Sequence, residues 1–215
     1  MELSADTTMM YLIRHGATSA NEQQPYILQG CSVDLSLSPT GREQAADVAR
    51  LLCDHRLARV YSSRLLRARE TATMIAQPHG LTVETLEGIE ECDVGAWERL
   101  DWETIRTRFP DEYQRFQDEP YETPYLRGES YRNVFDRAWP VLMRLLEQHR
   151  GETIAVVSHN VVNRVIVAEL LGLERRKAKE IRQVNGGVNV VRYRQGRASL
   201  LSLNTLFHLR NFIAD

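Results

Sequence analysis

Three short apolar runs each end in a polar triplet whose side chains could do chemistry. The triplets are Arg14-His15-Gly16, Ser62-Ser63-Arg64 and Ser158-His159-Asn160. Apolar runs of this length, bounded by turn residues, are typical of buried strands. Ligands of an open α/β sheet bind in the crevice outside the carboxyl ends of its strands. The sequence therefore predicts that two histidines and two arginines meet in one pocket.

These side chains suit a dianionic phosphoryl group. Arginine offers a planar fork of N–H donors that matches phosphate oxygens, and a neutral imidazole can act as a nucleophile toward phosphorus. A single triplet such as Arg14-His15-Gly16 is explained equally well as a strand that ends in polar residues. The three triplets together favour a phosphate site.

Other residues that could do chemistry have a simpler explanation. His55, His79 and His149 stand at predicted helix ends, where we expect structural or surface roles. Ser62 is expected to hydrogen-bond within a turn, because no Ser-His-Asp order accompanies it. The histidines are too scattered among basic residues to favour a metal site, and we expect neither a metal nor a cofactor.

The elements that must position the triplets alternate between strands and helices. Ser38-Pro39 predicts a helix start, with serine as the N-cap and proline at the first helical position. Apolar spacing predicts further helices over residues 65–75 and 131–146, a Val-rich helix after the third triplet that runs to Leu171, and strands over 58–61, 81–86 and 153–157. Residues 187–194 and 198–204 are predicted to form a hairpin that turns at Gln195-Gly196.

This order indicates one domain over residues 1–215. We expect an α/β fold, a three-layer α/β/α sandwich with a mostly parallel central sheet and a C-terminal antiparallel hairpin. Residues 1–8 are expected to form a loose N-terminal extension. The loop from Gly16 to Ser38 and the short helices and loop over 101–127 are expected to line the site. The charged segment over 174–182 is expected to be solvated surface.

Composition limits the partners and the setting. With 43% apolar and 26% charged residues and a net charge of -2, the chain is an ordinary globular protein without a global attraction to nucleic acid or anionic membranes. It shows no signal peptide and no apolar run of transmembrane length. Cys31, Cys53 and Cys92 are expected to be buried free thiols, which favours a reducing, cytoplasmic setting. A homodimer is compatible with the sequence, although no residue specifies one.

The ordered set of motifs from Met10 to Leu209 resembles the histidine phosphatase superfamily, which includes cofactor-dependent phosphoglycerate mutases and many phosphatases. The motifs are Arg14-His15-Gly16 with Thr18 and Asn21, Leu37-Ser38-Pro39-Thr40-Gly41 with Gln44-Ala45, Tyr61-Ser62-Ser63-Arg64-Leu65 with Arg67-Ala68 and Glu70-Thr71-Ala72, Gly128-Glu129-Ser130, Ser158-His159 with Arg164, and Asn204-Thr205 with His208-Leu209.

The resemblance implies a role for each matching position. His15 would be the nucleophile and become phosphohistidine, while Arg14, Arg64 and His159 would bind the phosphoryl oxygens with help from Asn21. The segment from Ile89 to Glu98 matches the one that carries the general acid, which assigns that role to Glu91 in preference to Glu90. Trp97, Trp102 and Tyr125 could line the pocket or pack in the core.

Two departures bear on the pocket. Asn160 stands where the family often has glycine, so its side chain would narrow the pocket or bind substrate, and Arg99 replaces a frequent glycine. The arginine- and tyrosine-rich segment of mutases has no match here. We therefore expect a metal-independent phosphatase that acts on small phosphomonoesters. The alternatives are a cofactor-dependent phosphoglycerate mutase and a non-catalytic module that binds phosphorylated proteins.

Overall fold

The computed structural model describes residues 3–210, and at its centre lies a six-stranded sheet in the order β3-β2-β4-β1-β5-β6. The strands are β1 (Thr7–Arg14), β2 (Leu57–Ser62), β3 (Val83–Thr85), β4 (Thr153–Ser158), β5 (Val188–Arg194) and β6 (Arg197–Thr205). Strands β1 to β4 run parallel, whereas β5 pairs antiparallel with both β1 and β6. The predicted mostly parallel sheet with a C-terminal antiparallel pair is confirmed.

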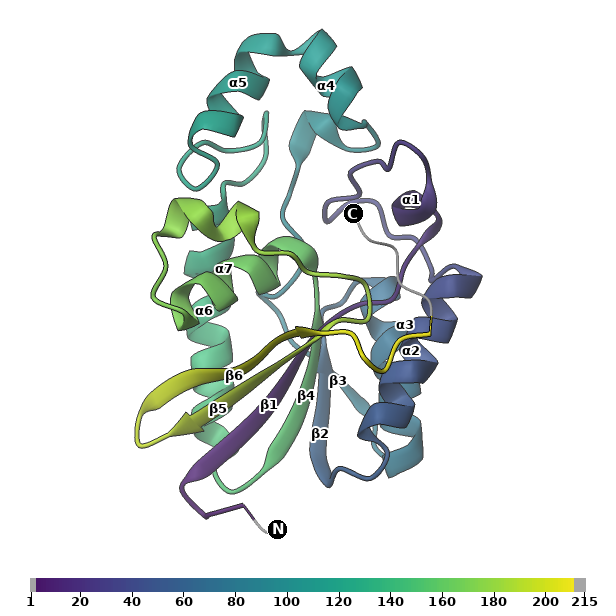
Figure 1. The fold of residues 1–215 in the computed structure, drawn as a ribbon, viewed down its shortest axis with the longest axis vertical. Helices are drawn as coiled ribbons and strands as arrows, with labels where there is room; N and C mark the ends of the chain where they lie inside the picture. The colour runs from purple at the N-terminus through teal and green to yellow at the C-terminus, as the bar shows by residue number, and fades with distance from the viewer. Residues whose placement is uncertain (1–2, 211–215) are drawn as a thin grey trace.

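Helices cover both faces of this sheet (Figure 1). They are α1 (Ser19–Glu22), α2 (Pro39–Leu52), α3 (Leu66–Ala76), α4 (Trp102–Arg108), α5 (Pro110–Asp118), α6 (Tyr131–Gln148) and α7 (Asn160–Leu170), with 3-10 helices η1 (Gln77–His79), η2 (Gly95–Trp97) and η3 (Arg175–Glu180). Met10 and Leu12 of β1 join the core shared with α6 and α7, whereas Ile13 joins the core shared with α2 and α3. Successive strand residues point to opposite faces, and burial of both faces produces the predicted three-layer sandwich.

The N-terminus of α2 is fixed by the residues that predicted it. Ser38 Oγ accepts a hydrogen bond from the Gly41 amide at 3.0 Å, and Pro39 opens the helix. Gly41 also lies directly against the loop that follows β1, where a Cβ atom on either Gly16 or Gly41 would overlap backbone atoms across the contact. Only glycine allows such a close approach, so α2 braces the loop that carries His15.

Several predicted boundaries differ from the structure. β1 begins at Thr7, and Thr8 Oγ1 donates to the Leu146 carbonyl at 2.7 Å, so the loose extension predicted over residues 1–8 is too long. Helix α1 interrupts the predicted Gly16–Ser38 loop, and β3 spans less than the predicted strand over 81–86. In the first two cases a local contact or a short turn of helix is added to a segment whose sequence is mainly polar.

Two predictions of burial also differ. The segment over 174–182 contains η3, which buries Ala178 against the core, so this segment is only partly solvated surface. Cys92 is buried, but Cys31 is partly exposed and Cys53 is exposed at the end of α2. The three cysteines are free thiols, as predicted.

Helices α4 and α5 stand beyond the end of the sheet at which β1 and β4 finish (Figure 1). An aromatic cluster anchors them, in which Phe116 lies 5.6 Å from Trp97 and 4.4 Å from Tyr125 between ring centroids. Such pairs add to the stability gained by burying the rings. Trp97 is fully buried and belongs to the core. Within residues 3–210, no helix has the length and apolar character needed to cross a membrane.

Candidate active site

His15 and His159 lie side by side because β1 and β4 are neighbouring strands whose ends coincide. Arg14 pairs with Ser158 in the parallel register, and the His15 amide donates to the Ser158 carbonyl at 3.1 Å. The residue after each strand is therefore a histidine. The two imidazole rings are both buried, with centroids 5.1 Å apart.

The hydrogen bonds of His15 define its tautomer. Its Nδ1 lies 2.7 Å from the Gly16 carbonyl oxygen, and because a carbonyl only accepts, Nδ1 carries the proton. Arg67 Nε donates to the unprotonated Nε2 at 3.2 Å. Burial, and then the charges of Arg67 and Arg14, hold the pKa of His15 well below its ordinary value. His15 is thus a neutral imidazole whose unprotonated Nε2 lies in the cavity and accepts a hydrogen bond from Arg67.

His159 is held by a serine that follows β2. Ser63 Oγ accepts from the Leu65 amide at 3.3 Å and lies 2.6 Å from His159 Nε2, so a hydrogen bond joins the two side chains. The other ring nitrogen, Nδ1, is buried without a hydrogen-bond partner among the described residues. Burial, followed by the charge of Arg67, lowers the pKa of His159 well below its ordinary value. This neutral ring keeps one nitrogen for a ligand.

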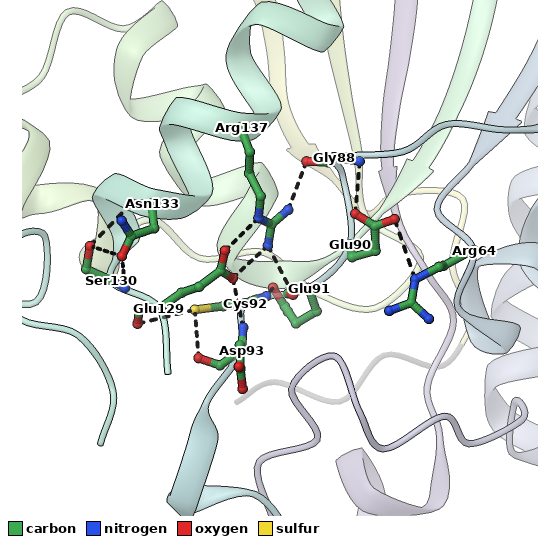
Figure 2. Close-up of polar contacts among 10 residues, drawn as sticks. All are labelled: Arg64, Gly88, Glu90, Glu91, Cys92, Asp93, Glu129, Ser130, Asn133 and Arg137. Atoms are coloured by element: carbon green, nitrogen blue, oxygen red, sulfur yellow. Dashed lines mark hydrogen bonds and ion pairs between the residues drawn. The ribbon is translucent and has the colours of Figure 1, made fainter. Parts of the chain in front are cut away.

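Arg67, and not the predicted Arg64, reaches the histidines. Arg67 is fully buried, and its guanidinium donates to the carbonyls of Val33 and Gly30 at 2.9 and 2.8 Å as well as to His15. The Arg64 side chain is 63% exposed and lies 3.8 Å from Glu90, outside the pocket (Figure 2). The chain turns into α3 after Ser63, which sends Arg64 outward and brings Arg67 onto the buried face of the helix. The assignment of Arg64 to the phosphate site is therefore corrected.

Glu91 carries its carboxylate to the N-terminus of α7. One oxygen accepts from the Asn160 amide at 2.9 Å and the other from the Val161 amide at 3.1 Å. Unpaired N–H groups and the helix dipole make such a terminus favourable for an anion. Glu90 instead accepts from the Gly88 amide at 2.9 Å and faces Arg64 (Figure 2). Of the two carboxylates, only that of Glu91 lines the pocket with His15.

A half-buried ion pair holds the segment that bears Glu91 (Figure 2). Arg137 of α6 donates twice to Glu129, at 2.8 and 2.9 Å, and also to the carbonyls of Gly88 and Glu91 at 2.8 and 3.1 Å. Glu129 in turn accepts from the Asp93 amide at 2.9 Å. The pair thus fixes the backbone on both sides of Glu91, which explains the Gly128-Glu129-Ser130 motif.

One cavity of about 90 Å³ unites most of the candidate residues. Its polar lining includes Arg14, His15, Asn21, Gln29, Arg67, Glu91, Asn160 and Arg164. Asn21 Oδ1 accepts from the Thr18 amide at 3.0 Å, which orients it at the start of α1. Trp102 Nε1 donates to the Tyr26 hydroxyl at 2.6 Å, and both rings line the same cavity. A larger hollow of about 860 Å³ lies at the opposite end of the sheet, around Tyr11 and His55, and contains none of the predicted site residues.

Sequence reasoning missed the parts played by Ser63 and Arg67. Arg67 precedes Ala68, Thr71, Ala72 and Ile75, which together form the buried face of α3. A cation on a buried helical face needs a partner. The position of Arg67 on that face could therefore have predicted that its side chain points into the site. Ser63 gave no such signal, because its hydroxyl acts through a contact with the distant His159.

The chain matches the model of the histidine phosphatase superfamily (branch 1) over residues 10–206. It is 31% identical over 206 residues to phosphoserine phosphatase 1 of Hydrogenobacter thermophilus, with 96% of each chain covered. The structure is similar to YhfR of Bacillus stearothermophilus, with a TM-score of 0.87 and 26% identity. The match covers 94% of this chain and 100% of YhfR. It is also similar to a mutant phosphoserine phosphatase of Entamoeba histolytica in complex with phosphoserine, with a TM-score of 0.83 and 30% identity. That match covers 94% of this chain and 99% of the phosphatase.

Proposed function

The chain belongs to the histidine phosphatase superfamily and is a phosphoric monoester hydrolase, and from this premise we propose that it hydrolyses small phosphomonoesters through phosphohistidine at His15, without a metal ion. The observation that carries the proposal is the neutral His15 imidazole, whose Nε2 lone pair lies beside Arg67 in the cavity that Glu91 also lines. The phosphoserine phosphatases among its relatives and structural neighbours support a small-molecule substrate.

In the first half of the reaction, Arg67 Nε exchanges His15 for a phosphoryl oxygen of the substrate, His15 Nε2 attacks phosphorus with the lone pair thus freed, and the ester P–O bond breaks. The Gly16 carbonyl accepts from Nδ1–H and so stabilises the positive charge that the ring gains. Arg14, Arg67 and the free ring nitrogen of His159 would bind the three equatorial oxygens, over which the charge is spread. Asn21 is proposed to add a further donor. The carboxyl group of Glu91 delivers a proton to the leaving alkoxide.

In the second half, the same carboxylate takes a proton from water as the water oxygen attacks phosphorus. The P–N bond breaks, inorganic phosphate leaves and His15 returns as a neutral imidazole. The cavity keeps donors fixed around the reacting group throughout, which is how preorganised electrostatics lowers a barrier.

The cationic groups of the site are its own arginines. Within residues 3–210, no three His, Cys, Asp or Glu side chains are grouped as a metal ion would need. This arrangement supports metal-independent catalysis. Phosphate release that is unchanged by EDTA would agree with it, and restoration of lost activity by an added divalent cation would contradict it.

The proposed nucleophile is tested by replacing it. His15→Ala is expected to lower phosphate release from p-nitrophenyl phosphate by at least about 10⁴-fold, because the covalent step is lost. Rapid quenching of the wild type in alkali should trap ³²P label that is stable in base and released by acid, as a phosphoramidate is. Equal phosphate release by wild type and variant would refute the mechanism.

The rival mutase activity transfers the phosphoryl group to an organic acceptor instead of water. Incubation with 3-phosphoglycerate, with and without 2,3-bisphosphoglycerate, separates the two activities. We expect phosphate release to exceed isomerisation under both conditions. Cofactor-dependent isomerisation that outpaces phosphate release would identify a mutase.

A further inference from the structure

Arg164 is a largely buried cation that the proposed phosphoryl transfer does not use. It lies on α7 and lines the same cavity as His15. Its Nε is buried without a hydrogen-bond partner among the described residues. Apart from burial, the strongest influences on its guanidinium come from phenols, through a hydrogen bond to Tyr131 and the nearby rings of Tyr125 and Tyr26. A buried cation without a carboxylate is costly, so this arrangement indicates a place for an anion.

Asn160 points to the same ligand. It stands one helical turn before Arg164, on the same face of α7, and lines the same cavity. Its backbone amide is bonded to Glu91, while its side-chain Oδ1 is buried without a partner in the described part of the chain. Two neighbouring side chains of one helix therefore leave polar atoms unsatisfied within one cavity, although buried polar groups are normally hydrogen-bonded.

The position of this pair separates it from the phosphoryl group. Arg67 and Arg14 are the arginines whose charges act on His15, which places them around the phosphorus. Arg164 lies beside Tyr131 and Tyr125 instead, and α7 begins at the carboxylate of Glu91. Because Glu91 is the proposed proton donor to the leaving oxygen, the face of α7 that bears Asn160 and Arg164 borders the leaving group.

We propose, on the basis of the proposed function, that Arg164 binds a carboxylate on the leaving alcohol and selects small phosphorylated hydroxy or amino acids as substrates. A carboxylate matches the planar fork of one guanidinium. A second phosphate would bring a dianion toward a single cation in a small cavity. Asn160 completes the subsite with its side-chain amide, so the departure from glycine at this position contributes to substrate choice.

The test uses two pairs of esters that differ in one carboxylate. O-phosphoserine is compared with O-phosphoethanolamine, and 3-phosphoglycerate with glycerol 3-phosphate, by the ratio of kcat/KM within each pair. We expect a wild-type ratio of about 100, the value of a charge-assisted hydrogen-bonded pair, and a ratio near one for Arg164→Met. Arg64→Met removes an exposed arginine outside the cavity and should keep the wild-type ratio.

Arg164→Lys keeps the charge without the fork and should lower the ratio about tenfold. If circular dichroism shows that Arg164→Met does not fold, the ratio measured for Arg164→Lys tests the proposal instead. A wild-type ratio below about three in both pairs, or a ratio unchanged by either substitution at Arg164, overturns the proposal.

A binding experiment keeps this inference distinct from the proposed function. In the His15→Ala background, calorimetry should give about 100-fold tighter binding of O-phosphoserine than of O-phosphoethanolamine, a preference that Arg164→Met removes. If His15→Ala turns over like the wild type, the phosphohistidine mechanism fails, yet this binding preference still decides the role of Arg164. Equal binding of the two esters would reject the carboxylate subsite alone.

Discussion

Two neighbouring hollows flank Glu91, and they differ in how their charges are satisfied. The larger one, about 520 Å³, contains the pairs Arg137–Glu129 and Arg64–Glu90 (Figure 2). In the smaller one, about 90 Å³, Arg67 bonds to carbonyls and to His15, and the nearest groups to Arg164 include the phenols of Tyr131 and Tyr125. The cations of the larger hollow are paired with carboxylates, whereas Arg67 and Arg164 of the smaller hollow form no ion pair among residues 3–210 and can bind an anion. The candidate site thus lies in the smaller of the two hollows.

The largest expected difference in kcat/KM is between variants of the two arginines that follow β2, Arg67 and Arg64. Arg67→Met should lower kcat/KM by about 10² to 10³-fold, the cost of removing one preorganised donor to a transition state. Arg64→Met removes an exposed ion pair worth little and should stay within about threefold of the wild type. Steady-state kinetics with p-nitrophenyl phosphate measures both. A larger loss for Arg64→Met would mean that the exposed hollow is the catalytic one.

A smaller effect is expected from a substitution in the larger hollow, which contains the Arg137–Glu129 pair. Arg137→Met frees the segment that bears Glu91, so kcat/KM for an alkyl phosphate should fall about tenfold through misplacement of the proton donor. For p-nitrophenyl phosphate the loss should be smaller, because its leaving group needs little protonation. Equal losses for both esters would show that Arg137 supports the fold without positioning Glu91.

The smallest effect concerns stability. Burial lowers the pKa values of His15 and His159 in the folded state, so below about pH 6.5 the unfolded state binds protons that the folded state does not. The free energy of unfolding should therefore fall as pH falls, by roughly 1 kcal/mol per histidine between pH 7.5 and 5.5. Urea denaturation at both pH values should show this loss in the wild type and a loss smaller by that amount in His159→Gln. The same loss in both proteins would argue against a neutral buried His159.

The sequence predicted what depends on local pattern. Apolar runs and helical spacing located the sheet and its helices, and the triplets at Arg14 and Ser158 pointed to His15 and His159 because neighbouring parallel strands end together. The assignment of Arg64 to the phosphate site was wrong because the turn of the chain after β2 decides which side chain points inward. The proposed role of Arg164 depends on its forming no ion pair among the described residues, which only tertiary contacts reveal. The single domain, the cytoplasmic setting and the homodimer stay predictions.

The contact between Gly16 and Gly41 also limits how this enzyme can change. Neither residue needs to touch a substrate, yet any side chain at either position would separate α2 from the loop that follows the proposed nucleophile, His15. A library that samples every substitution should therefore find these two positions as intolerant as His15 itself. We expect changes in substrate specificity to arise at positions such as Asn160 instead. Its side chain lines the cavity, and its replacement leaves the backbone contact between Gly16 and Gly41 in place.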